Sequence, residues 1–163
     1  MTLRKGSLAI LLLLAAAIGP VMLFESSGTE AVAQTAAKRA VTAENAPKAI
    51  GPYSHGIIAN GFIFLAGKIG TDPKTDALVA GGIAEQTDQA ISNLEAVLKA
   101  AGSSLDDVVK TTVFLADMND FAKMNEIYAR RFKAPFPARS TVQVARLPRD
   151  AKIEIEAVAV LSK

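Results

Sequence analysis

The sequence predicts an α+β domain with the element order β-β-α-β-α-β-β, in which two helices cover one face of a mixed sheet. Three features lead to this prediction: an Asn60-Gly61 pair between two β-like runs, two amphipathic stretches of helical period, and strict alternation over the last strand. Two helices can cover only one face of such a sheet. The second face is therefore exposed to water or covered by a partner chain.

The N-terminus has the three-part layout of a secretory signal. Arg4 and Lys5 precede an apolar run from Leu8 to Phe24, and a polar segment that contains Ala31-Val32-Ala33 follows. The small residues at the end of this segment match a signal-peptidase site. We therefore expect residues 1–33 to be a signal peptide and the rest of the chain to be exported, to the periplasm or outside the cell.

An uncleaved N-terminal segment that tethers the protein is the alternative, because the apolar run is at the short limit for spanning a bilayer. The Gly19-Pro20 pair interrupts that run and favours cleavage. Residues 1–33 hold two basic and two acidic residues, so the remaining chain keeps the formal charge of +2. This charge is too small to indicate a nucleic acid or, after cleavage, a membrane as partner.

After the signal, residues 34–40 are expected to be a mobile lead-in, and residues 41–163 form one domain, since their length suits a single core. The domain begins with a loop in which Pro47 and Gly51-Pro52 exclude a helix or a strand. The absence of Cys excludes a disulfide framework and a lipid-modified cysteine.

The first two strands form a hairpin over residues 57–59 and 62–66, because Asn60-Gly61 is the strongest short hairpin signal. A polar loop over 71–82 leads to a helix over 83–101, whose apolar residues fall on one face, and Gly102 ends it.

A third strand spans residues 108–115, with Val109, Thr111, Val113 and Leu115 expected on one face. Asn119 or Asp120 then caps a second helix. Its expected buried stripe consists of Phe121, Met124, Tyr128 and Phe132, and Pro135 and Pro137 end it.

The last two β-like runs, 136–146 and 153–161, flank a Leu147-Pro148 turn. We expect them to pair antiparallel, which would place Arg139 beside Glu154. Arg139 is then either part of a polar site or a structural partner of an acidic neighbour.

Alternation on the last strand gives one fully apolar face. The other face begins with Glu154 and Glu156 and ends with Val158 and Val160. This mixture predicts a subunit interface with a polar pocket at one end. The alternative is a salt-bridged sheet surface, in which each ion pair contributes about 0 to 1 kcal/mol.

Several kinds of site are not supported by the sequence. One His, no Cys and scattered carboxylates lack the clustered ligands of a metal site. No Gly-x-Ser-x-Gly elbow and no phosphate-binding loop are present.

Four motifs resemble the Rid (YjgF-type) family, and specifically the RidA-type enamine/imine deaminases. They are Asn45-Ala46-Pro47 with Ile50–Ser54, Val109–Phe114, Pro137–Ser140 and Ile153–Ala157, and the resemblance as a whole runs over roughly residues 41–163. The resemblance implies a chorismate-mutase-like, trimer-forming fold. In such homotrimers the sheets form a central barrel, and each active site lies in a cleft between two subunits.

The resemblance also implies a function: hydrolysis of 2-aminoacrylate-type enamines and imines to 2-oxo acids and ammonia, without a cofactor. The enzyme would be a 2-iminobutanoate/2-iminopropanoate deaminase-type hydrolase. Matched to the family motifs, Arg139 grips the substrate carboxylate and Glu154 is the acid/base group. The substrate-binding residues implied in the same way are Tyr53, Gly67, Asn125 and Thr141, and no metal is implied.

The sequence departs from the family pattern at three places. It has Ala66-Gly67-Lys68 where the family commonly has Ser-Gly-Gln, and Thr141 where a Cys often stands. Lys68 either adds positive charge near the cleft or points to solvent. The signal sequence is the third departure, and it leaves the physiological substrate open.

Two other functions remain compatible with this fold. The same trimer could bind 2-oxo acids without turnover, or act as a chaperone-like holdase. The modest charge and the absence of an evident aromatic stacking platform argue against RNA.

Overall fold

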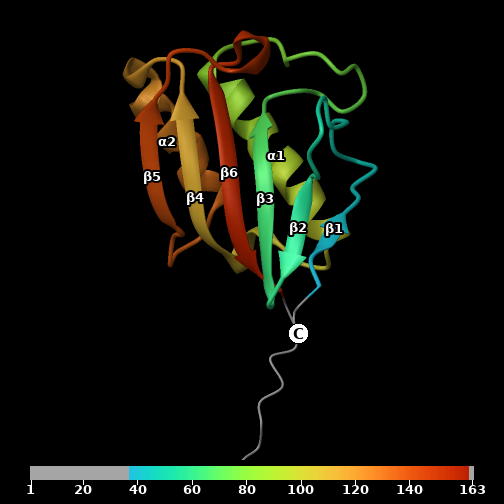
Figure 1. Ribbon diagram of the computed structural model, residues 1–163. Helices are drawn as coiled ribbons and strands as arrows, with labels where there is room; N and C mark the ends of the chain where they lie inside the picture. Colours follow the sequence, from blue (N-terminus) through green and yellow to red (C-terminus); the bar gives the residue numbers. More distant parts are fainter. Residues whose placement is uncertain (1–36, 162–163) are drawn as a thin grey trace, which may run out of the picture. The chain divides into compact units, whose positions relative to one another are not determined.

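A computed structural model describes residues 37–161, which fold into one sheet and two helices (Figure 1). The strands are β1 Arg39–Val41, β2 Gly56–Ala59, β3 Phe62–Ile69, β4 Val108–Leu115, β5 Ala138–Gln143 and β6 Ile153–Val160. The helices are α1 Ile83–Ala100 and α2 Phe121–Arg131, with short 3-10 turns η1 Leu105–Asp107, η2 Met118–Asp120 and η3 Pro148–Asp150. The predicted α+β class is confirmed. The predicted element order is also found, with β1 added before it.

The predicted signal peptide, residues 1–33, lies outside the described residues and stays a prediction. Strand β1 begins inside the segment expected to be a lead-in, because Arg39 and Ala40 pair with Ile58 and Ile57 of β2. Regular pairing therefore starts before Val41. Within residues 37–161, neither helix is long and apolar enough to cross a membrane.

The predicted hairpin between β2 and β3 is confirmed. Asn60 and Gly61 have φ values of 50° and 77°, which a tight two-residue hairpin turn requires. Strand β3 runs further than predicted, to Ile69, because the register shifts between Leu65 and Lys68 and pairing with β6 then resumes. A bulge therefore lies at Ala66-Gly67 in the middle of this strand.

Strand β6 lies in the middle of the sheet, whose order is β1-β2-β3-β6-β4-β5. It pairs antiparallel with both β3 and β4, and β5 pairs parallel with β4. The predicted antiparallel pairing of the two last runs is therefore wrong. In its central position β6 forms backbone hydrogen bonds on both edges, with β3 and with β4, and Ile153 and Ile155 are completely buried. These two neighbours take both edges of β6, so none is left for a hairpin with β5.

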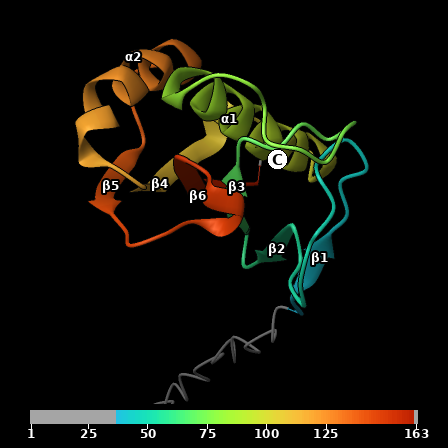
Figure 2. The ribbon, with the colours of Figure 1, turned by 90° about the horizontal axis from the view of Figure 1, so that it is seen from above.

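Both helices pack on the same face of the sheet, as Figure 2 shows from above. The core between them is formed by residues with no exposed surface, among them Ile63, Val113, Ile153, Ile155, Leu94 and Leu98. Helix α1 matches its predicted range closely, and Gly102 after it has a φ of 80°, which suits a helix end.

One predicted core residue is exposed instead, and Val109 departs from the face on which it was expected. Phe121 begins α2 and is 37% exposed, although Met124, Tyr128 and Phe132 are buried as predicted. Val109 is 44% exposed because the register between β4 and β6 shifts between Val108 and Lys110, which takes Val109 off the buried face.

The second face of the sheet carries no helix of the described chain (Figure 2). Phe62, Phe64 and Val142 are at least 40% exposed there. Val158 and Val160 lie opposite the two phenylalanines in register and are half-buried. This face is unusually apolar for a surface in contact with water.

Asn93 of α1 fixes the helix to the end of β3. The side chain is 2% exposed, and its amide nitrogen donates to the carbonyl oxygens of Ile69 at 3.0 Å and Thr71 at 2.8 Å. Gln89 in turn donates to the Asn93 side-chain oxygen at 2.9 Å. One buried amide therefore sets where the chain leaves β3.

We predict that Asn93→Ala lowers the free energy of unfolding by about 1–3 kcal/mol, because the buried Thr71 carbonyl loses its donor and the Ile69 carbonyl keeps only the Thr71 amide. Denaturant unfolding at fixed protein concentration measures this change. The control Ser92→Ala, one position away and less buried, should cost under about 1 kcal/mol. An equal loss in both variants would contradict the role of Asn93.

Candidate active site

The first half of the candidate site is a cavity of about 240 Å³ beside the β3 bulge, here called the Glu154 cavity. It contains three of the residues singled out by the sequence: Tyr53, Gly67 and Glu154. The remaining lining residues are Ile50, Ala66, Ile69 and Pro148. A carboxyl group thus lies in a largely apolar hollow at the surface of the sheet.

The Glu154 carboxyl group lies directly against the backbone of Gly67. A Cβ atom at Gly67 would be 1.8 Å from Oε1 of Glu154 and 2.7 Å from its Cδ. Any side chain there would therefore displace the carboxyl group. Glycine at this position in the bulge lets β6 bring an acidic side chain close to β3.

Burial raises the pKa of Glu154 above its ordinary value, and the nearby Glu156 carboxylate adds to this increase. The positive charge of Lys68 opposes both effects. A half-buried carboxyl group with a raised pKa holds a proton more readily than an exposed glutamate, which suits a general acid/base.

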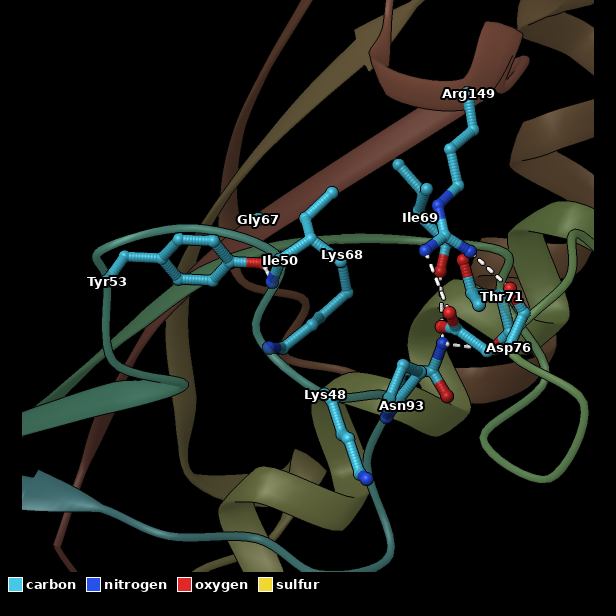
Figure 3. Close-up of a pocket in the computed structure, with 11 residues that line it drawn as sticks. Lys48, Ile50, Tyr53, Gly67, Lys68, Ile69, Thr71, Asp76, Asn93 and Arg149 are labelled. Carbon is cyan, nitrogen blue, oxygen red and sulfur yellow. Dashed lines mark hydrogen bonds and ion pairs between the residues drawn. The ribbon is translucent and has the colours of Figure 1, made fainter.

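Tyr53 lies in the loop before β2 and borders the Glu154 cavity. Its ring is 46% exposed, and the Ile50 amide donates to its hydroxyl oxygen at 3.4 Å. Figure 3 shows the hydroxyl end next to Ile50, and Tyr53 and Gly67 line the same cavity. The ring is thus placed to contact a ligand in the cavity.

The second half of the candidate site is a cavity of about 400 Å³, here called the Arg139 cavity. Its lining residues are Asn125, Tyr128, Ala129, Phe136, Pro137 and Arg139. Helix α2 and the start of β5 form its walls, so it is separate from the Glu154 cavity.

The guanidinium group of Arg139 is held by aromatic rings. Its Cζ atom lies 4.5 Å from the ring centre of Tyr128 and 5.8 Å from that of Phe121. The Tyr128 ring is fixed in turn, because its hydroxyl shares a 2.7 Å hydrogen bond with the Thr111 hydroxyl. Thr111 is also the register partner of Arg139 on β4.

Arg139 has no carboxylate partner within 4.0 Å among residues 37–161. The structural alternative, in which it pairs with Glu154 or Glu156, therefore does not hold within one chain. A stacked, unpaired guanidinium is suited to bind an incoming carboxylate through two parallel hydrogen bonds.

Asn125 and Thr141 both lie near Arg139. Asn125 lines the Arg139 cavity from α2. Thr141 follows two positions after Arg139, so both side chains point to the same face of β5. Its hydroxyl is buried and has no hydrogen-bond partner in the described part of the chain, so it is free to bond a ligand or a neighbouring chain.

Arg139 and Glu154 do not meet within one chain, so the expected pairing is wrong. Strand β4 separates β5 from β6. Arg139 lies in register with Thr111, and Thr111 pairs with Ala157, three positions from Glu154. Thr111 and Ala157 are buried under the helices, whereas Glu154 alternates to the open face.

Sequence reasoning missed the aromatic support of Arg139. Tyr128 was expected only as a core residue, although it lies three positions after Asn125 and therefore on the same helix face. That spacing was the available signal. Among the described residues, no group of three His, Asp or Glu side chains is placed to hold a metal ion.

Comparison with known proteins identifies the family. Residues 43–161 match the family model described as Endoribonuclease L-PSP. A RutC family protein of Pyrococcus horikoshii is 57% identical over 122 residues, 75% of this chain and 97% of the relative. The human 2-iminobutanoate/2-iminopropanoate deaminase is 51% identical over 123 residues, 76% of this chain and 90% of the relative.

A solved structure is also similar. The crystal structure of Escherichia coli TdcF with bound serine superposes with a TM-score of 0.72 at 42% identity. The match covers 76% of this chain and 99% of that protein.

We predict that Glu154→Gln increases the free energy of unfolding at neutral pH. Folding raises the pKa of Glu154 above its value in the unfolded chain. The contribution of this group to the free energy of unfolding is therefore largest below the unfolded pKa, and it is lost as the pH rises through the folded pKa. Glutamine removes this loss. Denaturant unfolding at a series of pH values measures it, with the exposed Glu44→Gln as control. An unchanged pH dependence in Glu154→Gln would contradict the prediction.

Proposed function

The chain belongs to the Endoribonuclease L-PSP (Rid) family, and from this membership and the two half-sites we propose that it is an enamine/imine deaminase. Its substrates are 2-imino acids and the corresponding enamines, which it hydrolyses to 2-oxo acids and ammonia. The observation that carries this proposal is the high identity to proteins named for this activity. The mouse and human deaminases are 49% and 51% identical over about three quarters of this chain.

Two features of the chain fit a substrate with a carboxylate. Arg139 has a stacked guanidinium without a carboxylate partner in the described residues. The similar TdcF structure holds serine, which also carries a carboxylate next to a nitrogen-bearing carbon. A 2-imino acid shares this arrangement.

We further propose that the complete site combines two copies of the chain. Arg139 and Glu154 lie in separate cavities on opposite faces of the sheet, so one chain cannot place both on one small substrate. The open face with Phe62, Phe64 and Val142 offers an apolar surface for the neighbouring copy. A cyclic trimer, as the family resemblance implies, supplies three equivalent shared sites.

In the proposed reaction, Arg139 of one copy binds the substrate carboxylate and orients the imine carbon toward Glu154 of the next copy. The Glu154 carboxylate accepts a proton from a water molecule as its oxygen adds to that carbon. Glu154 then returns this proton to the nitrogen, which gives a carbinolamine. The carboxylate next takes the proton of the new hydroxyl group and passes it to the amino group as the carbon–nitrogen bond breaks, so ammonia leaves and the carbonyl of the 2-oxo acid forms. For enamines, protonation of the carbon gives the imine first.

The remaining residues orient the substrate rather than react with it. Tyr53 borders one half of the proposed site and Asn125 the other, while Gly67 leaves room for the Glu154 carboxyl group. The unpaired Thr141 hydroxyl can bond the substrate near Arg139. An imine carbon is already electrophilic, so positioned water and a proton carrier suffice, and we propose no cofactor or metal.

We predict that Arg139→Ala lowers kcat/KM for ammonia release from freshly generated 2-iminopropanoate by about 10²-fold or more, because the carboxylate loses its charged partner. Arg130→Ala, which removes an exposed arginine of α2, should leave the rate unchanged. Size-exclusion chromatography verifies that the assembly persists.

The same assay separates the alternatives. A protein that only binds 2-oxo acids releases no ammonia above the uncatalysed rate in its wild-type form. A holdase suppresses client aggregation equally well after Arg139→Ala. Retention of most deaminase activity in Arg139→Ala would refute the carboxylate role of this residue.

We predict that mixing two inactive variants, Arg139→Ala and Glu154→Gln, restores activity if each site is shared between copies. After joint refolding, random assembly gives an intact arginine and an intact glutamate at about one quarter of the sites. The expected rate is therefore about a quarter of the wild-type rate. No recovery above the separate variants would show that the site lies within one chain.

A further inference from the structure

Lys68 is a buried lysine next to the Glu154 cavity. Lys68 belongs to β3 and is 6% exposed, so its side chain does not point to solvent. Its Nζ atom lies 3.0 Å from Nδ1 of His55, and no carboxylate lies within 4.0 Å of it among the described residues. A buried ammonium with so little compensation is costly, which calls for an explanation.

The Lys68 amine does not face the substrate directly. It lines a cavity of about 40 Å³ (Figure 3), which shares Ile50, Tyr53, Gly67 and Ile69 with the Glu154 cavity, whereas Lys68 lines only the small cavity. A water molecule needs about 10–15 Å³ of such space, so this cavity has room for a few waters and is too small for a 2-oxo acid. Lys68 is therefore not a substrate carboxylate clamp in the described chain.

The bulge in β3 nevertheless brings Lys68 near the Glu154 carboxyl group. It follows Gly67, against whose backbone that carboxyl group packs. In register, Lys68 lies opposite Ile155 and Ile69 lies opposite Glu154. The ammonium of the buried Lys68 and the half-buried carboxyl group of Glu154 thus lie on either side of the same short piece of backbone. Burial strengthens the interaction between two charges.

We infer that Lys68 is a positioning residue for the proposed acid/base group: its buried ammonium, held by His55, is the counter-charge of the Glu154 carboxylate across the bulge. Lys68 acts through Glu154 and does not touch the substrate. This inference deepens the proposed function and rests on it for its catalytic consequence. The charge coupling itself is independent of any activity.

The protonation states of the cluster agree with this role. Burial lowers the pKa of Lys68 to about 8, and the Glu154 carboxylate opposes that shift. Burial and the Lys68 charge also lower the pKa of His55, so the ring is neutral at neutral pH. Because an ammonium can only donate, Nδ1 of His55 accepts and the ring proton lies on Nε2.

The other charged groups around Lys68 do not replace this partner. Arg149 and Asp76, at the rim of the small cavity, form an ion pair with each other at 3.0 Å. Lys48 is exposed and Asn93 is uncharged, while Tyr53 lies between the two cavities. On β6, Glu156 is exposed and repels Glu154. Glu154 is therefore the anion on which the Lys68 charge acts.

The sign of the effect follows from the charges. Below a pH of about 8, Lys68 is charged and favours the ionised form of Glu154. Replacing Lys68 with methionine removes the charge at similar length, so the pKa of Glu154 rises. By reciprocity, Glu154→Gln lowers the pKa of Lys68. Lys68→Arg keeps a charge that does not titrate in this range.

The test is an NMR titration of the full chain with ¹³C-labelled glutamate carboxyl groups, with Glu154 assigned by its loss in Glu154→Gln. We expect the Glu154 titration to move upward by about 0.5–1 pH unit in Lys68→Met. It should move less in Lys68→Arg and not at all in Lys48→Gln, which removes an exposed lysine. The unaltered chain should show a second, smaller change near pH 8, as Lys68 loses its proton.

Measurements of enzyme activity provide a second test of the same inference. In pH profiles of kcat/KM for 2-iminopropanoate hydrolysis, the acidic limb of Lys68→Met should move upward by the same amount as its NMR titration, with KM at high pH unchanged. A wild-type chain without activity would refute the proposed function and leave the NMR arm to decide the coupling. A Glu154 titration that is equal in wild type and Lys68→Met, with no change near pH 8, would overturn the inference.

Discussion

The central position of β6, paired antiparallel on both edges, is the constraint on which the site depends. Because β6 buries Ile153 and Ile155 under the helices, alternation turns Glu154 to the open face. Strand β4 lies between β6 and β5. Arg139 consequently sits under α2, two strands away and on the other side of the sheet.

The bulge at Ala66-Gly67 is the second determinant of the site. Without it, alternation along β3 would continue unbroken, and the residues near Ile69 would change faces. With it, a glycine backbone meets the Glu154 carboxyl group, and the next side chain, Lys68, is buried on the other side. The bulge thus places the Glu154 carboxyl group and the Lys68 amine on either side of the same stretch of β3 backbone.

Local signals were sufficient for much of the fold. Asn60-Gly61 fixes a turn by its own φ values, and the apolar period fixes α1, so both were predictable from short windows. The partner of β6 was not predictable, because pairing between distant strands depends on the whole core. The burial of Lys68 and the exposure of Val109 depend on bulges, which leave little trace in composition.

The separation of Arg139 from Glu154 within one chain has a chemical advantage for a shared site. Side by side, the two groups would form an ion pair, which would occupy the guanidinium and lower the pKa of the carboxyl group. Kept apart, Arg139 remains without a carboxylate partner among residues 37–161, and Glu154 keeps a raised pKa. In the proposed composite site, the substrate carboxylate is then the anion that meets the guanidinium, and Glu154 remains available for proton transfer. A fold that separates these charges in each copy therefore favours chemistry that takes place between copies.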